Sequence, residues 1–258
     1  MLDFETFIAT VSRRGGLGRE EAVRTTQAVL ETLAARLTPG TSRDHGAVVG
    51  LAEHLPLEMA PWLLGSRRGE AFHVDEFLRR VASRTGSDLT DAERHARIVL
   101  DVLRSALPRE EIADLAADLP HDFQPFVLGL AVPSLSELAR HVAERLGVDD
   151  GAARRALEAV LETLAERMPP GEDDDLVAAL PIEFHEPVRR GARTSDDRFR
   201  GMQVGEFLRR VAVREGVEIG VALQHARAVL AALREEITDE AIDISTELSP
   251  DYDVLLSR

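Results

Sequence analysis

The sequence predicts an all-α protein in which four three-helix repeats are paired into two tandem helical bundles. One pattern occurs four times in the 258 residues with unchanged spacing: an apolar residue, then Val, Gly, Ala, Val-Leu and Leu. Such self-similarity indicates one supersecondary unit used repeatedly. Aromatic residues make up only 4% of the chain, so the core must consist mainly of Leu, Val and Ala. That composition suits close-packed helices better than a sheet, which favours aromatic and β-branched residues. The glycines that mark the four copies are Gly16, Gly86, Gly147 and Gly216.

Each repeat is predicted to begin with an amphipathic helix. In the second copy, apolar residues occupy positions i, i+3, i+4 and i+7, namely Val74, Phe77, Leu78 and Val81. This spacing places them on one face of a helix. The same apolar stripe begins at Phe4, Leu135 and Val204 in the other copies.

The repeated glycine is predicted to end this first helix. Glycine adopts the left-handed backbone conformation at a helix end without a Cβ penalty. A longer second helix follows, and a small residue recurs on its apolar face, at Ala22, Ala92, Ala153 and Ala222. We therefore interpret the glycines as structural and expect the alanines to let two helices approach closely.

Two Ser/Thr–Glu pairs predict where helices begin. In a capping box, the Ser or Thr side chain accepts from a backbone N–H three residues on, and the Glu accepts in return. Ser134 with Glu137 fits this motif at the first helix of the third copy, and Thr90 with Glu93 fits it in the second copy.

A short third helix is predicted to end at a Leu-Pro step. Proline disfavours helix at the residue before it, and Leu-Pro recurs at Leu55, Leu119 and Leu180, whereas the fourth copy has Leu248-Ser249-Pro250. Four residues past each of these leucines is a large residue that we expect to fill the end of a bundle: Met59, Phe123, Phe184 and Tyr252.

The copies follow an A-B-A′-B′ order. Copies one and three share Val-Leu-Glu-Thr-Leu-Ala, and copies two and four share Glu-Phe-Leu-Arg-Arg-Val-Ala and His-Ala-Arg. A pair of repeats was therefore itself duplicated. We predict two domains, residues 1–130 and 131–258, each a helical bundle of two repeats. A short continuous solenoid is the alternative architecture.

The repeated residues resemble a bacterial family catalogued as domain of unknown function 2267. The matching segments in the second copy are Phe77–Ala82, Gly86, Ala92–Leu103 and Leu115–Pro120. Members typically carry one pair of such repeats, and this chain resembles two of them in tandem. The resemblance implies a helical bundle. It implies no activity, and it transfers no catalytic residues.

Composition excludes several kinds of chemistry. The chain has no Cys, which removes thiolate catalysis and Cys-based metal centres, and no Lys, which removes Schiff-base chemistry. The formal net charge of −15 argues against binding to a nucleic-acid backbone. The exclusive use of Arg suggests a GC-rich bacterial source. With neither a secretory signal nor an apolar run long enough to span a membrane, we expect a cytoplasmic location.

His95 and His225 form the most notable candidate polar pair. Both lie nine residues past a repeated glycine, on or beside the apolar face of the second helix. A duplicated pair that met near a pseudo-two-fold axis would provide a pH-sensitive element or a metal ligand. The competing interpretation is that each is a partly buried histidine with a hydrogen-bonded ring, and no further ligand lies at suitable spacing.

Candidate partner-binding residues lie on the outer faces of the helices. The doublets Arg79-Arg80 and Arg209-Arg210 occupy matched positions and suit an acidic partner or a phosphate. The competing interpretation pairs them with the surplus acidic residues of the chain. Trp62, the only Trp, either fills a core or belongs to an exposed apolar patch for a partner.

We expect a non-enzymatic interaction or scaffold protein that binds a protein partner or itself, with no cofactor and no metal. Every repeated position is apolar or structural, and no catalytic constellation repeats. Ser42, Asp44 and His45 lie together in one loop, which is a poor scaffold for a catalytic triad. The alternatives are a small-molecule sensor or enzyme with a site between the bundles, and a helix-turn-helix-like nucleic-acid regulator.

Overall fold

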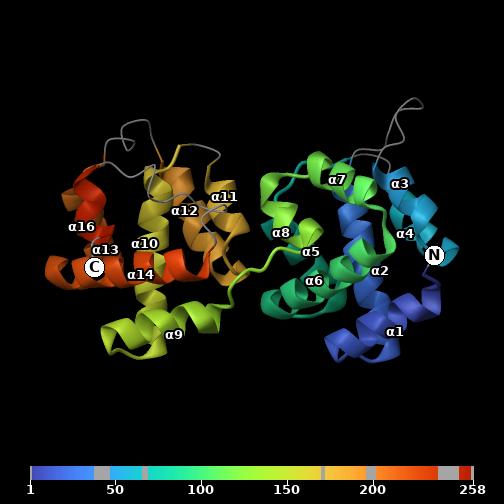
Figure 1. The fold of residues 1–258 in the computed structure, drawn as a ribbon, viewed down its shortest axis with the longest axis horizontal. Helices are drawn as coiled ribbons and strands as arrows, with labels where there is room; N and C mark the ends of the chain where they lie inside the picture. Colours follow the sequence, from blue (N-terminus) through green and yellow to red (C-terminus); the bar gives the residue numbers. More distant parts are fainter. Residues whose placement is uncertain are drawn as a thin grey trace. The chain divides into compact units, whose positions relative to one another are not determined.

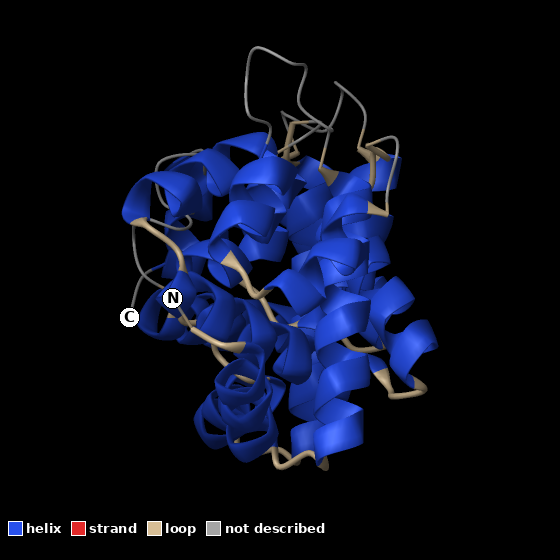
Figure 2. Cartoon of the chain, turned by 90° about the vertical axis from the view of Figure 1, so that its right-hand side faces the viewer, coloured by secondary structure: helices blue, strands red, loops and turns tan. Residues whose placement is uncertain are grey.

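The chain is all-α, as the sequence predicts. The computed structural model describes residues 2–37, 47–65, 69–169, 172–195, 202–237 and 250–256, and the regular secondary structure within these ranges is entirely helical (Figures 1 and 2). The chain divides into two compact units, Met1–Ala131 and Val132–Arg258, which we call unit 1 and unit 2. The repeat pattern placed the boundary after residue 130.

Each unit contains two repeats. The elements of unit 1 are α1 (Phe4–Gly15), α2 (Arg19–Arg36), α3 (Ala47–His54), η1 (Leu57–Met59), α4 (Ala60–Leu64), α5 (Val74–Thr85), α6 (Leu89–Ala106), α7 (Arg109–Asp118), η2 (His121–Phe123) and α8 (Gln124–Leu128). The described elements of unit 2 are α9 (Leu135–Leu146), α10 (Asp150–Arg167), α11 (Asp173–Ala178), η3 (Ile182–Phe184), α12 (His185–Thr194), α13 (Val204–Glu215), α14 (Ile219–Glu236), η5 (Pro250–Tyr252) and α16 (Asp253–Leu256).

The four repeats have the same two long helices. The first helix is 12 residues long in every repeat, and the second is 18 residues long. The third part differs from the single helix that we expected. In the first three repeats it is a helix that ends before the Leu-Pro step, a 3-10 turn after the proline, and a second helix. The residues before Pro250 in the fourth repeat lie outside the described part of the chain.

Within a unit the two repeats interlock. Helix α1 packs against both α2 and α6, and α5 packs against both α6 and α2. Unit 2 repeats the arrangement, with α9 against α10 and α14, and α13 against α14 and α10. Each first helix therefore covers the second helices of both repeats. The recurring alanines of these second helices are completely buried, in agreement with close helix packing.

The four repeated glycines end the first helices in the left-handed conformation, which confirms their structural role. Their φ angles are 67°, 74°, 67° and 73° for Gly16, Gly86, Gly147 and Gly216. In each case the N–H of the residue after the glycine donates to a carbonyl five residues earlier. A Cβ would meet no atom within 4 Å at any of the four positions. The backbone conformation, not crowding, therefore favours glycine there.

One of the two predicted capping boxes is confirmed. The Ser134 side chain accepts from the Glu137 N–H, and the Glu137 carboxylate accepts from the Ser134 N–H. The prediction for Thr90 and Glu93 is wrong. The N-cap of α6 is Asp88, whose carboxylate accepts from the Asp91 N–H at 2.8 Å.

The even-numbered repeats cap their first helix from a distant segment. Asp122, in the 3-10 turn after the Leu-Pro step, accepts from the Val74 N–H at 3.1 Å at the start of α5. Asp251 accepts from the Val204 N–H at 2.8 Å at the start of α13. The odd-numbered repeats use local caps instead, Asp3 and Ser134. The A-B-A′-B′ order therefore extends from sequence to hydrogen bonding.

The large residues after the Leu-Pro steps fill the core as predicted. Met59, Phe123, Phe184 and Tyr252 are all completely buried. Two of them meet the aromatic residue of the first helix edge-on: Phe123 lies 5.4 Å from Phe77, and Tyr252 lies 5.5 Å from Phe207, between ring centroids. The Tyr252 hydroxyl also donates to the Met202 carbonyl at 2.8 Å.

Candidate functional site

His95 is a buried histidine of α6 in unit 1. Its side chain packs near Gly15 of α1, and its Nε2 has no hydrogen-bond partner among the described residues. Burial lowers the pKa of His95 below its usual value of 6.5, and the charge of Arg94 lowers it further. The neutral imidazole is therefore the form that this site favours.

His225 occupies the equivalent position in α14 of unit 2 but has a different partner. Its Nδ1 lies 2.5 Å from Oε1 of Glu215, whose side chain is almost fully buried at the end of α13. The two histidines belong to different units and have unlike surroundings, since His95 Nε2 has no partner among the described residues whereas His225 contacts a carboxylate. His225 therefore agrees with the competing interpretation, in which the histidine is partly buried and its ring is hydrogen-bonded.

The arginine doublets each combine an exposed residue with a half-buried one. Arg79 and Arg209 are the exposed members, each paired with a glutamate one turn earlier on its own helix. Arg80 contacts Glu70 and Glu76 and stacks 4.3 Å from the centre of the Phe72 ring. Arg210 contacts Glu206 and the buried Glu166. The second arginine of each doublet therefore serves internal packing.

Trp62 lies in α4 and is neither fully buried nor fully exposed. Its ring is 6.0 Å from that of Phe4, the first residue of α1. Leu57 and Leu64 beside it in sequence are 86% and 55% exposed. Trp62 thus packs against the first residue of α1, and exposed apolar side chains lie near it in the sequence.

A recurring arginine–threonine contact links the repeats in both units. Arg84 of α5 donates to Oγ1 of the buried Thr32 in α2. The equivalent Arg214 of α13 donates to Oγ1 of Thr163 in α10 at 2.8 Å. Each threonine hydroxyl in turn donates a hydrogen bond to a carbonyl one turn earlier, that of Ala28 or Ala159. The threonine belongs to the sequence shared by copies one and three, so this motif has a structural explanation.

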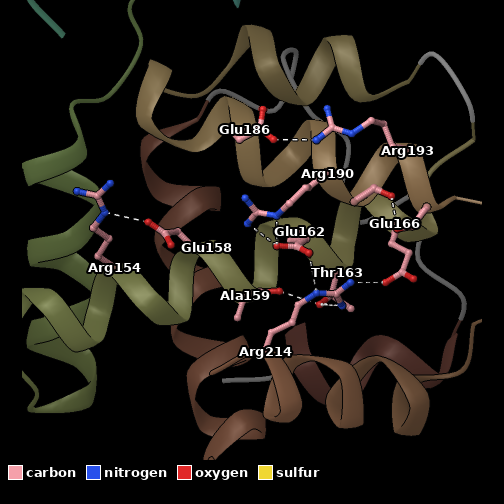
Figure 3. A network of polar contacts seen from close by, with 12 residues as sticks. Arg154, Glu158, Ala159, Glu162, Thr163, Glu166, Glu186, Arg190, Arg193 and Arg214 are labelled. Atoms are coloured by element: carbon pink, nitrogen blue, oxygen red, sulfur yellow. Dashed lines mark hydrogen bonds and ion pairs between the residues drawn. The ribbon is translucent and has the colours of Figure 1, made fainter. Parts of the chain in front are cut away.

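Unit 2 adds a charged network around this contact, which we call the α10 network (Figure 3). Arg214 lies 3.1 Å from Oε1 of Glu162 and donates to Oε2 of Glu166 at 2.8 Å. Arg190 of α12 donates to Glu162 at 2.6 Å, and Arg210 contacts Glu166. Burial raises the pKa of Glu162, but hydrogen bonds from Arg190 and Arg214 outweigh it and hold this pKa below its usual value.

The same position in unit 1 has one carboxylate fewer. Glu166 is replaced by Ala35, which is buried. Glu162 corresponds to Glu31, which keeps the carboxylate and accepts from the amide of Gln27 at 2.7 Å. The repeat pattern does not predict the α10 network, because Glu166 has no counterpart in unit 1. The signal was two glutamates one turn apart on α10, facing two arginines one turn apart on α13.

A second feature absent from the sequence predictions is an open pocket between α6 and α8, which we call the α6–α8 pocket. Its volume is about 180 Å³. The lining combines charged and apolar residues, namely Arg97, Asp101, Arg104, Pro125, Phe126, Gly129 and Leu130. All of these residues belong to unit 1.

The turn between α13 and α14 exposes three apolar residues, which we call the apolar corner. Val213, Ile219 and Val221 are 82%, 49% and 38% exposed. The first repeat has charged residues at these places, Arg13, Arg19 and Glu21. The helices α13 and α14 are also the pair that together have the length and hydropathy of a membrane span, although they are bent by 97°; no single described helix does.

Ser42, Asp44 and His45 lie outside the described residues, so their arrangement is not part of this structure.

Comparison with known proteins identifies the family. A family model described as "Uncharacterized conserved protein (DUF2267)" matches residues 4–126 and again residues 136–255. The chain belongs to this family. No curated protein and no solved structure matches the chain significantly.

The two DUF2267 matches coincide with the two units. Each match spans one pair of repeats, so a DUF2267 domain is the interlocked pair and the chain contains two in tandem. The resemblance noted in the sequence is confirmed. The family description carries no activity, and the candidate site must therefore be argued from the residues themselves.

Proposed function

We propose that this tandem DUF2267 protein is a non-enzymatic interaction protein, and that the apolar corner of its fourth repeat docks a partner protein or a second copy of the chain. The observation that carries the proposal is the exposure of Val213, Ile219 and Val221 on a turn where no other repeat has three large apolar residues. Burial of such side chains on association is favourable by roughly 25 cal/mol per Å² of apolar surface.

The recurring polar groups support this choice by being used internally. The arginine–threonine contacts and the distant helix caps, Asp122 and Asp251, bind neighbouring helices of their own unit. Their recurrence is therefore explained by folding. The residues that differ between repeats are the better candidates for function.

The exposed arginines Arg79 and Arg209 provide secondary contacts in this proposal. Each keeps a glutamate partner on its own helix, and exposed pairs of this kind contribute little to stability. An acidic group of a partner would exchange with that glutamate at small cost. We also propose a location in the bacterial cytoplasm, which rests on the Arg-only composition and the family resemblance. The net charge of −15 favours a protein partner over nucleic acid.

The experiment is a comparison of two double variants of the full chain. Val213→Glu with Ile219→Glu charges the apolar corner, and Ser83→Glu with Leu89→Glu charges the matched turn of unit 1. Sedimentation equilibrium measures self-association, and affinity capture from the native host with mass spectrometry measures partner retention.

The proposal expects a partner, or a second copy, that the wild type and the unit 1 variant bind and that the corner variant loses. Unchanged binding by the corner variant would contradict it, as would a wild type that stays monomeric and captures nothing specific. Arg79→Ala with Arg209→Ala is expected to weaken the same complex by a smaller factor.

A further inference from the structure

We propose that the α6–α8 pocket of unit 1 binds a small organic carboxylate with a short apolar body. This inference is independent of the proposed docking function, since none of the pocket residues belongs to the apolar corner. It rests on the arginines of the pocket, on its apolar lining, and on their absence from the matched place in unit 2.

Two arginines on one face of α6 line the pocket with donors to spare. Arg97 and Arg104 are seven residues apart, which is two helical turns. Arg97 uses Nε and Nη2 on a single oxygen of Glu93. Arg104 contacts Asp101 through Nη2, while its Nε is buried and has no hydrogen-bond partner in the described part of the chain. A buried donor without a partner is costly, and an oxyanion would satisfy it.

The local charge is positive although the chain as a whole is acidic. Asp101 is shared between Arg104 and Arg14 of α1. Three arginines therefore meet two carboxylates, those of Asp101 and Glu93, around the pocket. One positive charge is left over, which favours a monoanion over a neutral ligand.

The apolar part of the lining comes from α8 and the residues after it. Pro125, Phe126 and Leu130 form it, and the guanidinium of Arg97 lies 4.2 Å from the centre of the Phe126 ring. A planar carboxylate suits the fork of a guanidinium, and an apolar group attached to it would contact these side chains. The volume of about 180 Å³ is below that of most drug-sized sites, so the ligand must be small.

Gly129 allows Arg104 to approach the backbone at the end of α8. This glycine has a φ of 70°, and a Cβ at this position would lie 2.6 Å from Nη2 of Arg104. The guanidinium therefore rests directly against the peptide chain. Its position at the pocket wall is fixed by Gly129 on one side and by the contact with Asp101 on the other.

The matched place in unit 2 lacks this combination, which makes it an internal control. Asp101 corresponds to Ala231, and Phe126 corresponds to Leu255. Arg227, the counterpart of Arg97, donates to the carbonyl of Val254 at 2.7 Å, so that its guanidinium is used by the backbone. Arg234, the counterpart of Arg104, is exposed.

The test is a benzoate titration of the full chain, followed by NMR of the arginine Nε–H groups. We expect saturable shifts of the Arg97 and Arg104 signals, with a dissociation constant on the order of 1 mM for so small a ligand. Inorganic phosphate, which has no apolar body, is expected to bind at least about fivefold more weakly, because it buries no apolar surface.

Variants locate the site. Arg104→Gln is expected to weaken benzoate binding about tenfold, which corresponds to the loss of one charge-assisted pair. Arg234→Gln in unit 2 is expected to leave it unchanged. Arg97→Gln supplies a second variant should Arg104→Gln disturb the fold, which the thermal unfolding curve shows.

Three results would overturn the proposal. The first is the absence of any saturable shift at the two signals. The second is an equal loss of binding in Arg234→Gln and in the pocket variants, which would indicate a general charge effect. The third is phosphate binding as tight as benzoate binding, since the apolar wall would then contribute nothing.

Discussion

Unit 1 and unit 2 have the same arrangement of long helices and differ in what they place between them. In unit 1, the contact of Arg84 with Thr32 joins α5 to α2, and the buried Ala35 occupies the position of Glu166. In unit 2, the matched helices α10 and α13 meet through the α10 network, which includes the buried Glu166. The same arrangement of long helices therefore accommodates an alanine at this position in unit 1 and a charged network in unit 2.

The difference has a structural cause in the third part of the repeat. Helix α4 of unit 1 has 5 residues, whereas α12 of unit 2 has 10. The longer α12 continues across α10 and brings Arg190 to Glu162. This close crossing depends on Gly191, where a Cβ would lie 2.0 Å from the Glu162 carbonyl oxygen. The extra turns of α12 thus add Arg190 to the α10 network.

The largest expected effect is the loss of this crossing in Gly191→Ala. The added Cβ must push α12 away from α10, and we expect it to destabilise unit 2 by more than about 3 kcal/mol. Hydrogen exchange of the full chain should then show faster exchange in α10 and α12, with unit 1 unaffected. Gly205→Ala, at a helical site with no atom within 4 Å of the added Cβ, is the control. It should be neutral or slightly stabilising.

The next largest effect is the difference in stability loss between the two units when a matched arginine is removed from each. Arg214→Ala leaves the buried Glu166 with one arginine fewer, and we expect it to cost about 2 kcal/mol in unit 2. Arg84→Ala removes a hydrogen bond to Thr32, which keeps its bond to the Ala28 carbonyl, and should cost about 1 kcal/mol in unit 1. Hydrogen exchange measures the local free energy of unfolding in each variant. Equal losses of this free energy in Arg214→Ala and Arg84→Ala would contradict the claim that the two interiors differ.

The smallest effect is the pH dependence of unit 1. The folded-state pKa of His95 lies below its usual value of 6.5, mainly through burial. Its contribution to stability is therefore present above about pH 6.5 and is lost as the pH falls through the lower folded pKa. The hydrogen-exchange protection factors of α6, which correct for the intrinsic pH dependence of exchange, should fall in this range, and His95→Gln should remove the fall. His225→Gln, by contrast, should lower the stability of unit 2 even at neutral pH, because the buried carboxylate of Glu215 loses its partner. An unchanged pH profile in His95→Gln would refute this account.

The arrangement of the long helices could be predicted from the sequence because it recurs in every repeat. Within each copy, the glycine keeps a fixed spacing to the apolar residues before and after it, and that spacing corresponds to helices of 12 and 18 residues in every repeat. The cap of α6 was misassigned because Asp88 and Thr90 are both good N-cap residues, and a single sequence does not decide between them.

The polar contacts in the interior could not be predicted from the sequence, for a physical reason. The contact of Arg190 with Glu162 joins residues 28 positions apart, and it depends on how far α12 extends. The α6–α8 pocket likewise depends on the angle at which α8 approaches α6. Helical periodicity predicts which face of a helix is buried, but not which partner lies opposite each polar side chain.

A double-mutant cycle between Arg214 and Glu166 tests the central claim most directly. The claim is that unit 2 replaces part of an apolar interior with a charged network inside the same frame. Glu166→Ala recreates the residue type of Ala35, and the local unfolding free energy of α10 is measured by hydrogen exchange in both single variants and in the double variant. We predict a coupling of between about 1 and 3 kcal/mol. A coupling below about 0.5 kcal/mol would contradict the claim, because the two side chains would then be energetically independent.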